Sequence, residues 1–563
     1  MKPLHSLVTI VYCFVCVVAV SGGDSTSTIV GTKNGPIVGE RRGNYYAFEG
    51  IPYAKAPIGK LRFEPSELND ELWTEPRNTT RFGPVCLQWN HLNPNDDKLD
   101  GAEDCLFLNV YTRNADPAAK LPTIVFIHGG ALMFGMGSFY EPDHLMHRPL
   151  VLVTFNYRLG PLGFLSTEDD AIPGNYGLKD QVTALRWVQE NIGSFGGDPG
   201  RVTIVGYSAG SASVHLHYLS PRSSGLFSNG IGHSGTALNP WVMAERSAEK
   251  AKRLAAALGC PTRKTLALRD CLRERPAEDI VRQVSSLLDF LYNPFSPFGV
   301  VLEKRTVNNP EPFLEQTPRS LMVDGTFNKL PLILSVTEAE GLYPGAEFCS
   351  KPEYLAAIDS HWNELIPSIL DYKTAVPERA NRDLLSSAIR KHYFGSQRVT
   401  VDTFGDLVRL ISNRLYFVGF TETAKLMQRH TPVYLYVDHY KAKYGVGEAL
   451  SHRDDLGVAH GDDVLLIFPS VLRHLVPYTD EELDVVDRFV GMYETFAKGG
   501  KPTFGSYELP VQDSSEVITY LKLNYPTSQT VRSAGVSDEA FWNELDCNDA
   551  PRDVVVHTPH SEL

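Results

Sequence analysis

One serine lies between two glycines in Gly206-Tyr207-Ser208-Ala209-Gly210, where the residue pattern changes. Apolar and β-branched residues precede this pentapeptide, and an apolar-spaced stretch follows it to Leu216. This context predicts a strand that turns sharply into a helix, which strains the backbone at the serine and exposes its hydroxyl. The flanking glycines leave room for so tight a turn. We therefore predict that Ser208 is a nucleophile.

A serine hydroxyl attacks an ester or amide only when a base takes its proton, and a carboxylate must orient that base. In chains with this serine turn the order is serine, acid, histidine. Glu340 follows the apolar run 330–336 and precedes a glycine, while Glu338 on the same turn is an alternative. His460 lies in a glycine-flanked loop beyond the apolar run 432–440. These residues are the predicted acid and base.

A tetrahedral intermediate also needs N–H donors for its oxyanion, each worth about 3–4 kcal/mol in the transition state. The segment Ile127–Leu132, which reads IHGGAL, ends an apolar run in a glycine-rich loop upstream of the serine. Its backbone can approach a ligand closely, and Ala209 at the start of the predicted helix supplies a further N–H.

The elements that must position these residues alternate between strand and helix patterns. Apolar runs at 104–112, 122–130 and 150–158 suit strands buried on both faces, as parallel strands between helices are. Asn34-Gly35 separates two β-rich runs and predicts a hairpin. Apolar residues recur every three or four positions from Leu178 to Ile192, before Gly196-Gly197, and a late helix is expected near 484–498. The pattern predicts an α/β fold with a large, mostly parallel sheet and helices on both faces.

The composition is that of a globular protein, with 563 residues, 43% hydrophobic residues and a net charge of −14. We found no basic run, so nucleic acid is not an expected partner. Residues 1–21 have the pattern of a secretory signal peptide, which leaves 22–563 as one domain. The alternative is a membrane anchor, but the apolar run Leu7–Val20 is shorter than the about 20 residues that a span needs. No stable membrane anchor is therefore expected.

The cysteines fit an exported chain. Cys13 and Cys16 leave with the signal, and two close pairs would close short loops as disulfides: Cys86 with Cys105, and Cys260 with Cys271. Cys349 and Cys547 have no assigned state. Neither a zinc-type spacing nor another metal site is indicated. Asn78 begins an N-x-[ST] glycosylation sequon. The C-terminal His-Ser-Glu-Leu is similar to an ER-retention signal, so we expect secretion or retention in the ER lumen.

Two longer segments resemble signatures of the type-B carboxylesterase/lipase family, the cholinesterase-like α/β hydrolases. They are Glu103–Tyr111, which reads EDCLFLNVY, and Gly174–Ser213, which contains the serine turn. The similarity runs from about Ser27 to Asn543 and is strongest to exported insect carboxylesterases. It implies the α/β-hydrolase fold and a triad of Ser208, Glu340 and His460. It also implies oxyanion donors at Gly130, Ala131 and Ala209, and the two disulfides named above.

Two departures from the family pattern bear on the substrate. Tyr207 stands before the serine, where the family commonly has a glutamate that favours cationic substrates and juvenile hormone esterases usually have a glutamine. The loop between Cys86 and Cys105 is shorter than in cholinesterases, and Ala131 replaces the third glycine of the oxyanion loop. Choline esters are therefore not the expected substrates.

The predicted activity is that of a serine carboxylesterase, which hydrolyses small esters through an acyl-enzyme and needs no cofactor. The alternatives are a juvenile-hormone-esterase-type or lipase activity, and a non-catalytic adhesion relative on the same fold. The oligomeric state stays open, because nothing in the sequence decides it.

Overall fold

The computed structural model describes residues 27–453, 456–470, 476–513 and 516–545. The predicted signal peptide, Cys13, Cys16, Cys547 and the C-terminal His-Ser-Glu-Leu lie outside these ranges.

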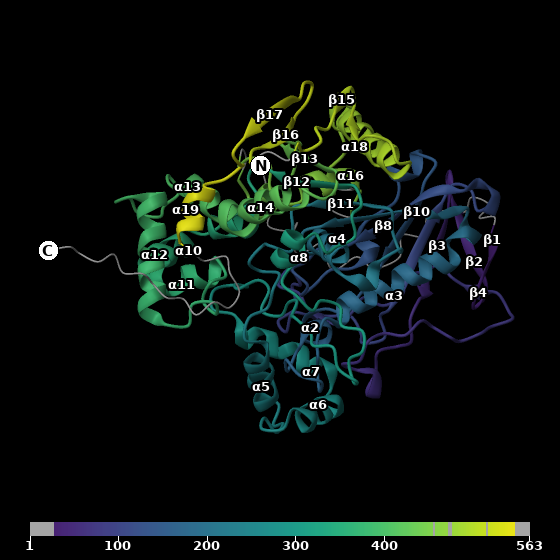
Figure 1. Ribbon diagram of the computed structural model, residues 1–563, viewed down its shortest axis with the longest axis horizontal. Coiled ribbons are helices and arrows are strands. Elements are labelled where there is room, and N and C mark those ends of the chain that lie inside the picture. The colour runs from purple at the N-terminus through teal and green to yellow at the C-terminus, as the bar shows by residue number, and fades with distance from the viewer. Residues whose placement is uncertain (1–26, 454–455, 471–475, 514–515, 546–563) are drawn as a thin grey trace, which may run out of the picture.

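A single large sheet runs through the centre of the molecule (Figure 1). Its strands lie in the order β1-β2-β3-β7-β9-β8-β10-β11-β12-β13-β16-β17, with β4 paired to β2. Their bounds are β1 Ser27–Thr32, β2 Gly35–Arg42, β3 Tyr45–Pro52, β4 Arg77–Asn78, β7 Phe107–Thr112, β8 Leu121–Ile127, β9 Val151–Phe155, β10 Gly197–Tyr207, β11 Asn229–His233, β12 Leu332–Thr337, β13 Val433–Asp438, β16 Ile518–Leu523 and β17 Gln529–Ser533. Two short pairs stand apart: β5 Gln88–Trp89 with β6 Leu99–Asp100, and β14 Thr503–Phe504 with β15 Tyr507–Glu508.

The centre of the sheet is parallel and its two ends are antiparallel, apart from the short β4, which pairs with β2 in parallel. The strands from β9 through β8, β10, β11, β12 and β13 to β16 pair in parallel. The hairpins at either end pair antiparallel, and so does β7 with both β3 and β9. The buried runs therefore form strands as predicted, but the expectation of parallel pairing is wrong for β7, because burial on both faces does not fix strand direction.

Alternate residues of the central strands enter two separate cores, one on each face. Ile124 and Phe126 of β8 pack toward Phe489 of α18 (Asp480–Ala497), whereas Val125 and Ile127 belong to the core on the other face. That second core is covered by α3 (Tyr176–Asn191) and α4 (Ala209–Leu219), with α14 (Val418–Met427) over the later strands. Helices on both faces of a mostly parallel sheet confirm the predicted fold class.

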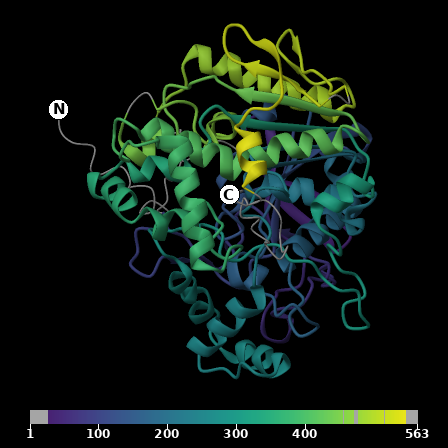
Figure 2. The same cartoon turned by 60° about the vertical axis from the view of Figure 1, so that its left-hand side comes forward.

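Several of the remaining helices pack against other helices, as α10 does on α11, α11 on α12 and α12 on α13. Figures 1 and 2 place α5 and α6 at one end of the molecule and the β16–β17 hairpin at the opposite end. Among the described residues, no helix is long and apolar enough to span a membrane. The helices not yet given are α2 Gly160–Phe164, α5 Ser247–Ala257, α6 Thr265–Glu274, α7 Ala277–Arg282, α8 Pro318–Asp324, α9 Leu342–Phe348, α10 Pro352–Ser360, α11 Trp362–Ile369, α12 Arg379–Phe394, α13 Phe404–Ser412, α15 Val446–Ser451, α16 Asp462–Ile467 and α19 Glu539–Glu544.

Two turn predictions differ from the structure by a few residues. The first hairpin turns at Lys33-Asn34, and Gly35 already opens β2 opposite Thr32. The helix predicted from Leu178 to Ile192 is α3, and its C-terminal end passes through a short 3₁₀ turn to Gly196, whose φ of 79° is left-handed. Gly197 then begins β10, so Gly196 alone ends the helical stretch.

Candidate active site

Ser208 lies between the last residue of β10 and the first residue of α4. Its φ of 57° and ψ of −121° are strained for a residue with a side chain. The flanking glycines are required by close backbone contacts: a Cβ at Gly206 would lie 2.1 Å from the Gly210 oxygen, and one at Gly210 would lie 2.0 Å from the Ile127 oxygen. The residue is 7% exposed. The sharp strand-to-helix turn predicted from the sequence is present, and the amide of Ser208 donates to the His233 oxygen at 2.8 Å.

Glu340 is fully buried three residues after β12. One carboxylate oxygen accepts hydrogen bonds from the Ser234 hydroxyl at 2.5 Å and from the Thr337 amide at 2.7 Å. The other oxygen lies 2.5 Å from Nδ1 of His460. Glu338, the alternative acid, is half exposed and faces His439 at 3.5 Å, and this contact lowers the pKa of the Glu338 carboxyl. The structure therefore brings Glu340, and not Glu338, to the predicted base.

His460 lies in the turn that precedes α16, and it is 2% exposed. Because Nδ1 faces the Glu340 carboxylate, that nitrogen carries the proton and Nε2 is left as an acceptor. Nε2 is buried and has no hydrogen-bond partner among the residues described. The hydrogen bond between a catalytic base and its serine hydroxyl often forms only in the complex with substrate. The turn also contacts Tyr207, the residue before Ser208, whose hydroxyl donates to the backbone oxygen of His460 at 3.3 Å.

Aromatic rings surround the imidazole of His460. The rings of Tyr207 and Tyr416 lie 4.9 Å and 4.7 Å from it between centroids, and Tyr343 stacks on it at 5.6 Å with an interplanar angle of 20°. Burial raises the pKa of the Tyr343 and Tyr416 hydroxyls, so both are neutral at pH 7. Apart from the Glu340 carboxylate, the groups around the base are therefore aromatic and neutral.

The glycine-rich loop after β8 lies against the nucleophile, since a Cβ at Gly129 would be 2.9 Å from Cβ of Ser208. Gly130 and Ala131 both have left-handed φ values, 109° and 56°. Within the described ranges, the amides of these two residues donate to no backbone carbonyl. The amide of Ala209 has no partner inside α4 because it opens the helix. Three N–H groups are thus available near Ser208.

Several residues that support this arrangement were not found from the sequence. The hydroxyl of Ser296 donates to the Ala131 oxygen at 2.9 Å, and Ser234 holds Glu340. Tyr343 and Tyr416 contact the base from segments far from the motifs. No sequence pattern marks Ser234, because the strand before it, Asn229–His233, reads NGIGH and contains a single β-branched residue.

The other predicted residues are the disulfide cysteines and the asparagine of the glycosylation sequon. Cys86 and Cys105 are joined at an S–S distance of 2.04 Å, and Cys260 and Cys271 at 2.08 Å. Cys349 is a buried free thiol. Asn78 is exposed on β4, and its side-chain oxygen accepts hydrogen bonds from the amide and hydroxyl of Thr80.

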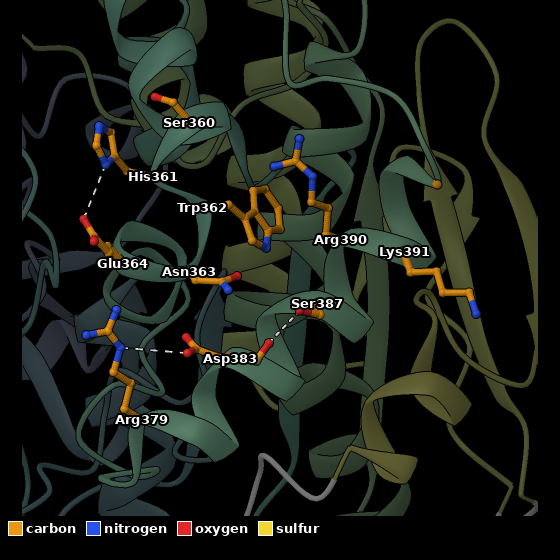
Figure 3. A pocket seen from close by; sticks show the side chains of 11 residues that line it. Ser360, His361, Trp362, Asn363, Glu364, Arg379, Asp383, Ser387, Arg390 and Lys391 are labelled. Atoms are coloured by element: carbon orange, nitrogen blue, oxygen red, sulfur yellow. Dashed lines mark hydrogen bonds and ion pairs between the residues drawn. The ribbon is translucent and has the colours of Figure 1, made fainter.

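A separate surface groove lies between α11 and α12 (Figure 3). Its charged groups pair locally: His361 with Glu364 at 3.4 Å, and Arg379 with Asp383 at 3.8 Å. None of the residues lining it is a predicted site residue. The chemistry predicted from the sequence therefore belongs to the sheet edge and not to this groove.

The chain is similar to known esterases over most of its length. Residues 26–542 match the carboxylesterase family. A carboxylic ester hydrolase of Bombus ignitus is 39% identical over 90% of this chain and 91% of the relative, and venom carboxylesterase-6 of Apis mellifera is 37% identical over the same shares. Esterase P of Drosophila melanogaster is 36% identical over 88% of this chain and 93% of its own.

A solved structure of juvenile hormone esterase from Manduca sexta, with OTFP covalently attached, has a TM-score of 0.79 to this chain at 27% identity. It covers 92% of this chain and 99% of its own. Both the sequence matches and the structural match extend over nearly the whole length. The chain therefore belongs to the carboxylesterase family of carboxylic ester hydrolases.

Proposed function

We propose that the chain is a serine carboxylesterase that works through an acyl-enzyme. Ser208 is the nucleophile, His460 the general base and acid, and Glu340 the residue that orients the imidazole. The amides of Gly130, Ala131 and Ala209 bind the oxyanion. The observation that carries this proposal is the 2.5 Å contact between Glu340 and Nδ1 of His460, on a turn that contacts Tyr207, the neighbour of the strained Ser208.

The steps follow from the positions of the protons. Nε2 of His460 takes the proton of the Ser208 hydroxyl as the oxygen attacks the ester carbonyl, and Glu340 stabilises the imidazolium. The negative oxygen of the tetrahedral intermediate lies on the backbone amides. The imidazolium then protonates the leaving alcohol, which departs and leaves an acyl group on Ser208. Water attacks this acyl-enzyme with the same histidine as base. The imidazolium then returns the proton to the Ser208 oxygen as the acyl bond breaks, which releases the carboxylic acid and regenerates Ser208.

The substrates are proposed to be small neutral esters. Tyr207 brings a hydroxyl rather than a carboxylate next to the nucleophile, and neutral tyrosine rings surround the base. Without a carboxylate at position 207, a negative charge that would favour a cationic alcohol is missing. The likeness to a juvenile hormone esterase supports a hormone-type ester as the second candidate substrate. A non-catalytic role has less support, since all three reactive residue types are present. A lipase would use the same residues and would be recognised by interfacial activation, for which the sequence gives no sign.

The cellular route is also a proposal. Two disulfides support passage through an oxidising compartment, as the pattern of residues 1–21 predicts. The exposed Asn78 is a proposed glycosylation site. We further propose that residues 22–563 fold as one domain that is secreted or kept in the ER lumen.

An organophosphate labelling experiment tests the proposed function. The purified chain should hydrolyse an aryl ester, lose this activity with a phosphonylating reagent, and carry the adduct on Ser208 in a mass-spectrometric peptide map. Ser208→Ala should abolish labelling and turnover while the melting temperature stays close to the original. An adduct on another residue, with Ser208 unmodified in inactivated enzyme, would refute the assignment. A panel that includes a juvenile-hormone-like ester and a choline ester separates the candidate substrates.

A further inference from the structure

The C-terminal end of β11 contacts the segments that carry all three proposed triad residues. The backbone oxygen of His233 accepts from the amide of Ser208, and the next residue, Ser234, donates to Glu340. The side chain of His233 points in another direction, toward Asp463 in the first turn of α16. This imidazole has no part in the mechanism given above, although it is buried beside the site.

The imidazole of His233 is fully enclosed by polar partners from four different elements. Its Nδ1 lies 3.0 Å from a carboxylate oxygen of Asp463 and 2.9 Å from the hydroxyl of Tyr436. Its Nε2 lies 2.6 Å from the hydroxyl of Tyr493 on α18, and Ser335 on β12 lies 3.2 Å from Nδ1. Both His233 and Asp463 are buried. The carboxylate accepts from Nδ1, so the Nδ1 position carries a proton.

Asp463 connects this buried cluster to the turn of His460, which lies three residues earlier. Its second oxygen accepts from the amide of Val464 at 2.8 Å, so the carboxylate is fixed at the start of α16. Asp438 at the end of β13 is buried nearby, and burial together with the negative charge of Asp463 raises the pKa of its carboxyl. The turn of His460 is thus held by Glu340 through Nδ1, by Tyr207 at its backbone oxygen and by His233 through Asp463.

Stability alone gives little reason for such a pair. Burying two polar groups carries a desolvation cost, and well-packed apolar residues of the same volume often stabilise a fold as well or better. What a buried hydrogen-bonded pair supplies that apolar packing does not is a single, directed position for the elements it joins. Here those elements are the strand end that contacts Ser208 and Glu340, and the turn that bears His460.

We propose that His233 and Asp463 form a positioning pair that fixes the imidazole of His460 relative to Ser208. This proposal rests on the proposed function of the triad. Neither residue touches the substrate, and their effect on the reaction passes through the placement of Nε2. A displacement of about 1 Å at a reacting group lowers a rate by about 100-fold. Losing the pair should therefore lower turnover with little change in substrate binding.

The experiment measures kcat for each titrated active site, so that a loss of folded protein is not mistaken for slower chemistry. The variants are Asp463→Asn, His233→Ala, His233→Asn and, as the matched control, Tyr493→Phe, which removes the hydroxyl on Nε2 and leaves the contact to Asp463. Sites are counted by organophosphate labelling of Ser208, and kcat and KM are measured on an aryl ester. Thermal melts record the folded state of each variant.

We expect kcat per site to fall about 10- to 100-fold in Asp463→Asn and His233→Ala, with KM within threefold of the original. His233→Asn places an amide N–H near the former Nδ1 and should recover a large part of kcat. Tyr493→Phe should stay within threefold. If His233→Ala does not fold, Asp463→Asn and His233→Asn decide between the outcomes.

The proposal is overturned if Asp463→Asn keeps its kcat per site within twofold while only its melting temperature falls. It is also overturned if Tyr493→Phe loses as much turnover as His233→Ala, because general packing would then explain the effect. Absence of a label on Ser208 in the unmodified chain would instead overturn the proposed function, and the role of the pair with it.

Discussion

Replacing Glu340 by glutamine tests the orientation of His460 at a single atom. One oxygen of the buried carboxylate accepts two hydrogen bonds, from the Ser234 hydroxyl and the Thr337 amide. In Glu340→Gln the amide oxygen must take this position, because an NH2 group there would face two donors. The amide nitrogen then faces Nδ1 of His460 and donates to it. The proton of the neutral imidazole is thereby moved from Nδ1 to Nε2.

An imidazole with its proton on Nε2 cannot accept the proton of Ser208, and the negative charge that stabilises the imidazolium is also gone. The same kind of substitution in a serine protease triad lowers kcat by about 10⁴-fold, which corresponds to about 5.5 kcal/mol of transition-state stabilisation. We expect a loss of 10³- to 10⁴-fold here, with KM nearly unchanged. The melting temperature should change little, because glutamine has the same shape and keeps the contacts to Ser234 and Thr337.

Steady-state kinetics on an aryl ester measures this effect, with sites titrated by an organophosphate. Glu338→Gln is the matched control, because Glu338 is a carboxylate on the same turn that faces His439 and not His460. The control should keep kcat within twofold. A Glu340→Gln enzyme within tenfold of the original, or a Glu338→Gln enzyme that is the slower of the two, would contradict the reasoning.

Three other substitutions test the surroundings. Gly130→Ala puts a Cβ 1.9 Å from the Phe134 oxygen at a φ of +109° and should lower kcat by 10²- to 10³-fold; a kcat within threefold would argue against the oxyanion role. Replacing Cys86 and Cys105 together by serine opens a loop of 19 residues and should lower the free energy of unfolding in urea by about 3 kcal/mol; an unchanged value would contradict the disulfide. Burial raises the pKa of Asp462 to about 6, so the folded state holds its proton more tightly and this contribution to stability falls as pH rises from about 4 to 6. Between pH 4 and 7 the melting temperature of Asp462→Asn should therefore fall less with rising pH than that of the original chain. Curves of melting temperature against pH that run parallel for the two proteins would contradict this.

The strand-to-helix turn at Ser208 could be predicted because all its determinants are local. The apolar run of β10, the two glycines and the start of α4 are contiguous in sequence, and the glycines leave the room that the tight turn needs. The direction of β7 could not be predicted in the same way. Its residues are buried on both faces, as those of β8 are, yet β7 runs antiparallel to its neighbours. Burial depends on what covers a strand, whereas direction depends on the length and path of the connections.

The choice between Glu338 and Glu340 shows where residue patterns stop being informative. Both carboxylates lie on one turn, and the residues alone fit either as the acid. The difference arises from Ser234 and Thr337, whose donors hold the Glu340 carboxylate toward the sheet edge. Ser234 lies more than one hundred residues away in the sequence, so a single sequence contains no local signal for this contact. The resemblance to the family favoured Glu340, and the contacts give the physical reason.

The anchors around the site share one chemical feature, which links fold and turnover. Ser234 holds Glu340, Ser296 holds the carbonyl of Ala131, and Asp463 holds the start of α16, each through a buried polar contact. A typical buried hydrogen bond contributes only about 1 kcal/mol to stability, which is a small part of the free energy of unfolding. A small displacement of a catalytic group, however, changes a rate by orders of magnitude. Conservative changes at these anchors should therefore lower kcat well before they lower the melting temperature, whereas changes of equal size in the apolar cores should do the reverse.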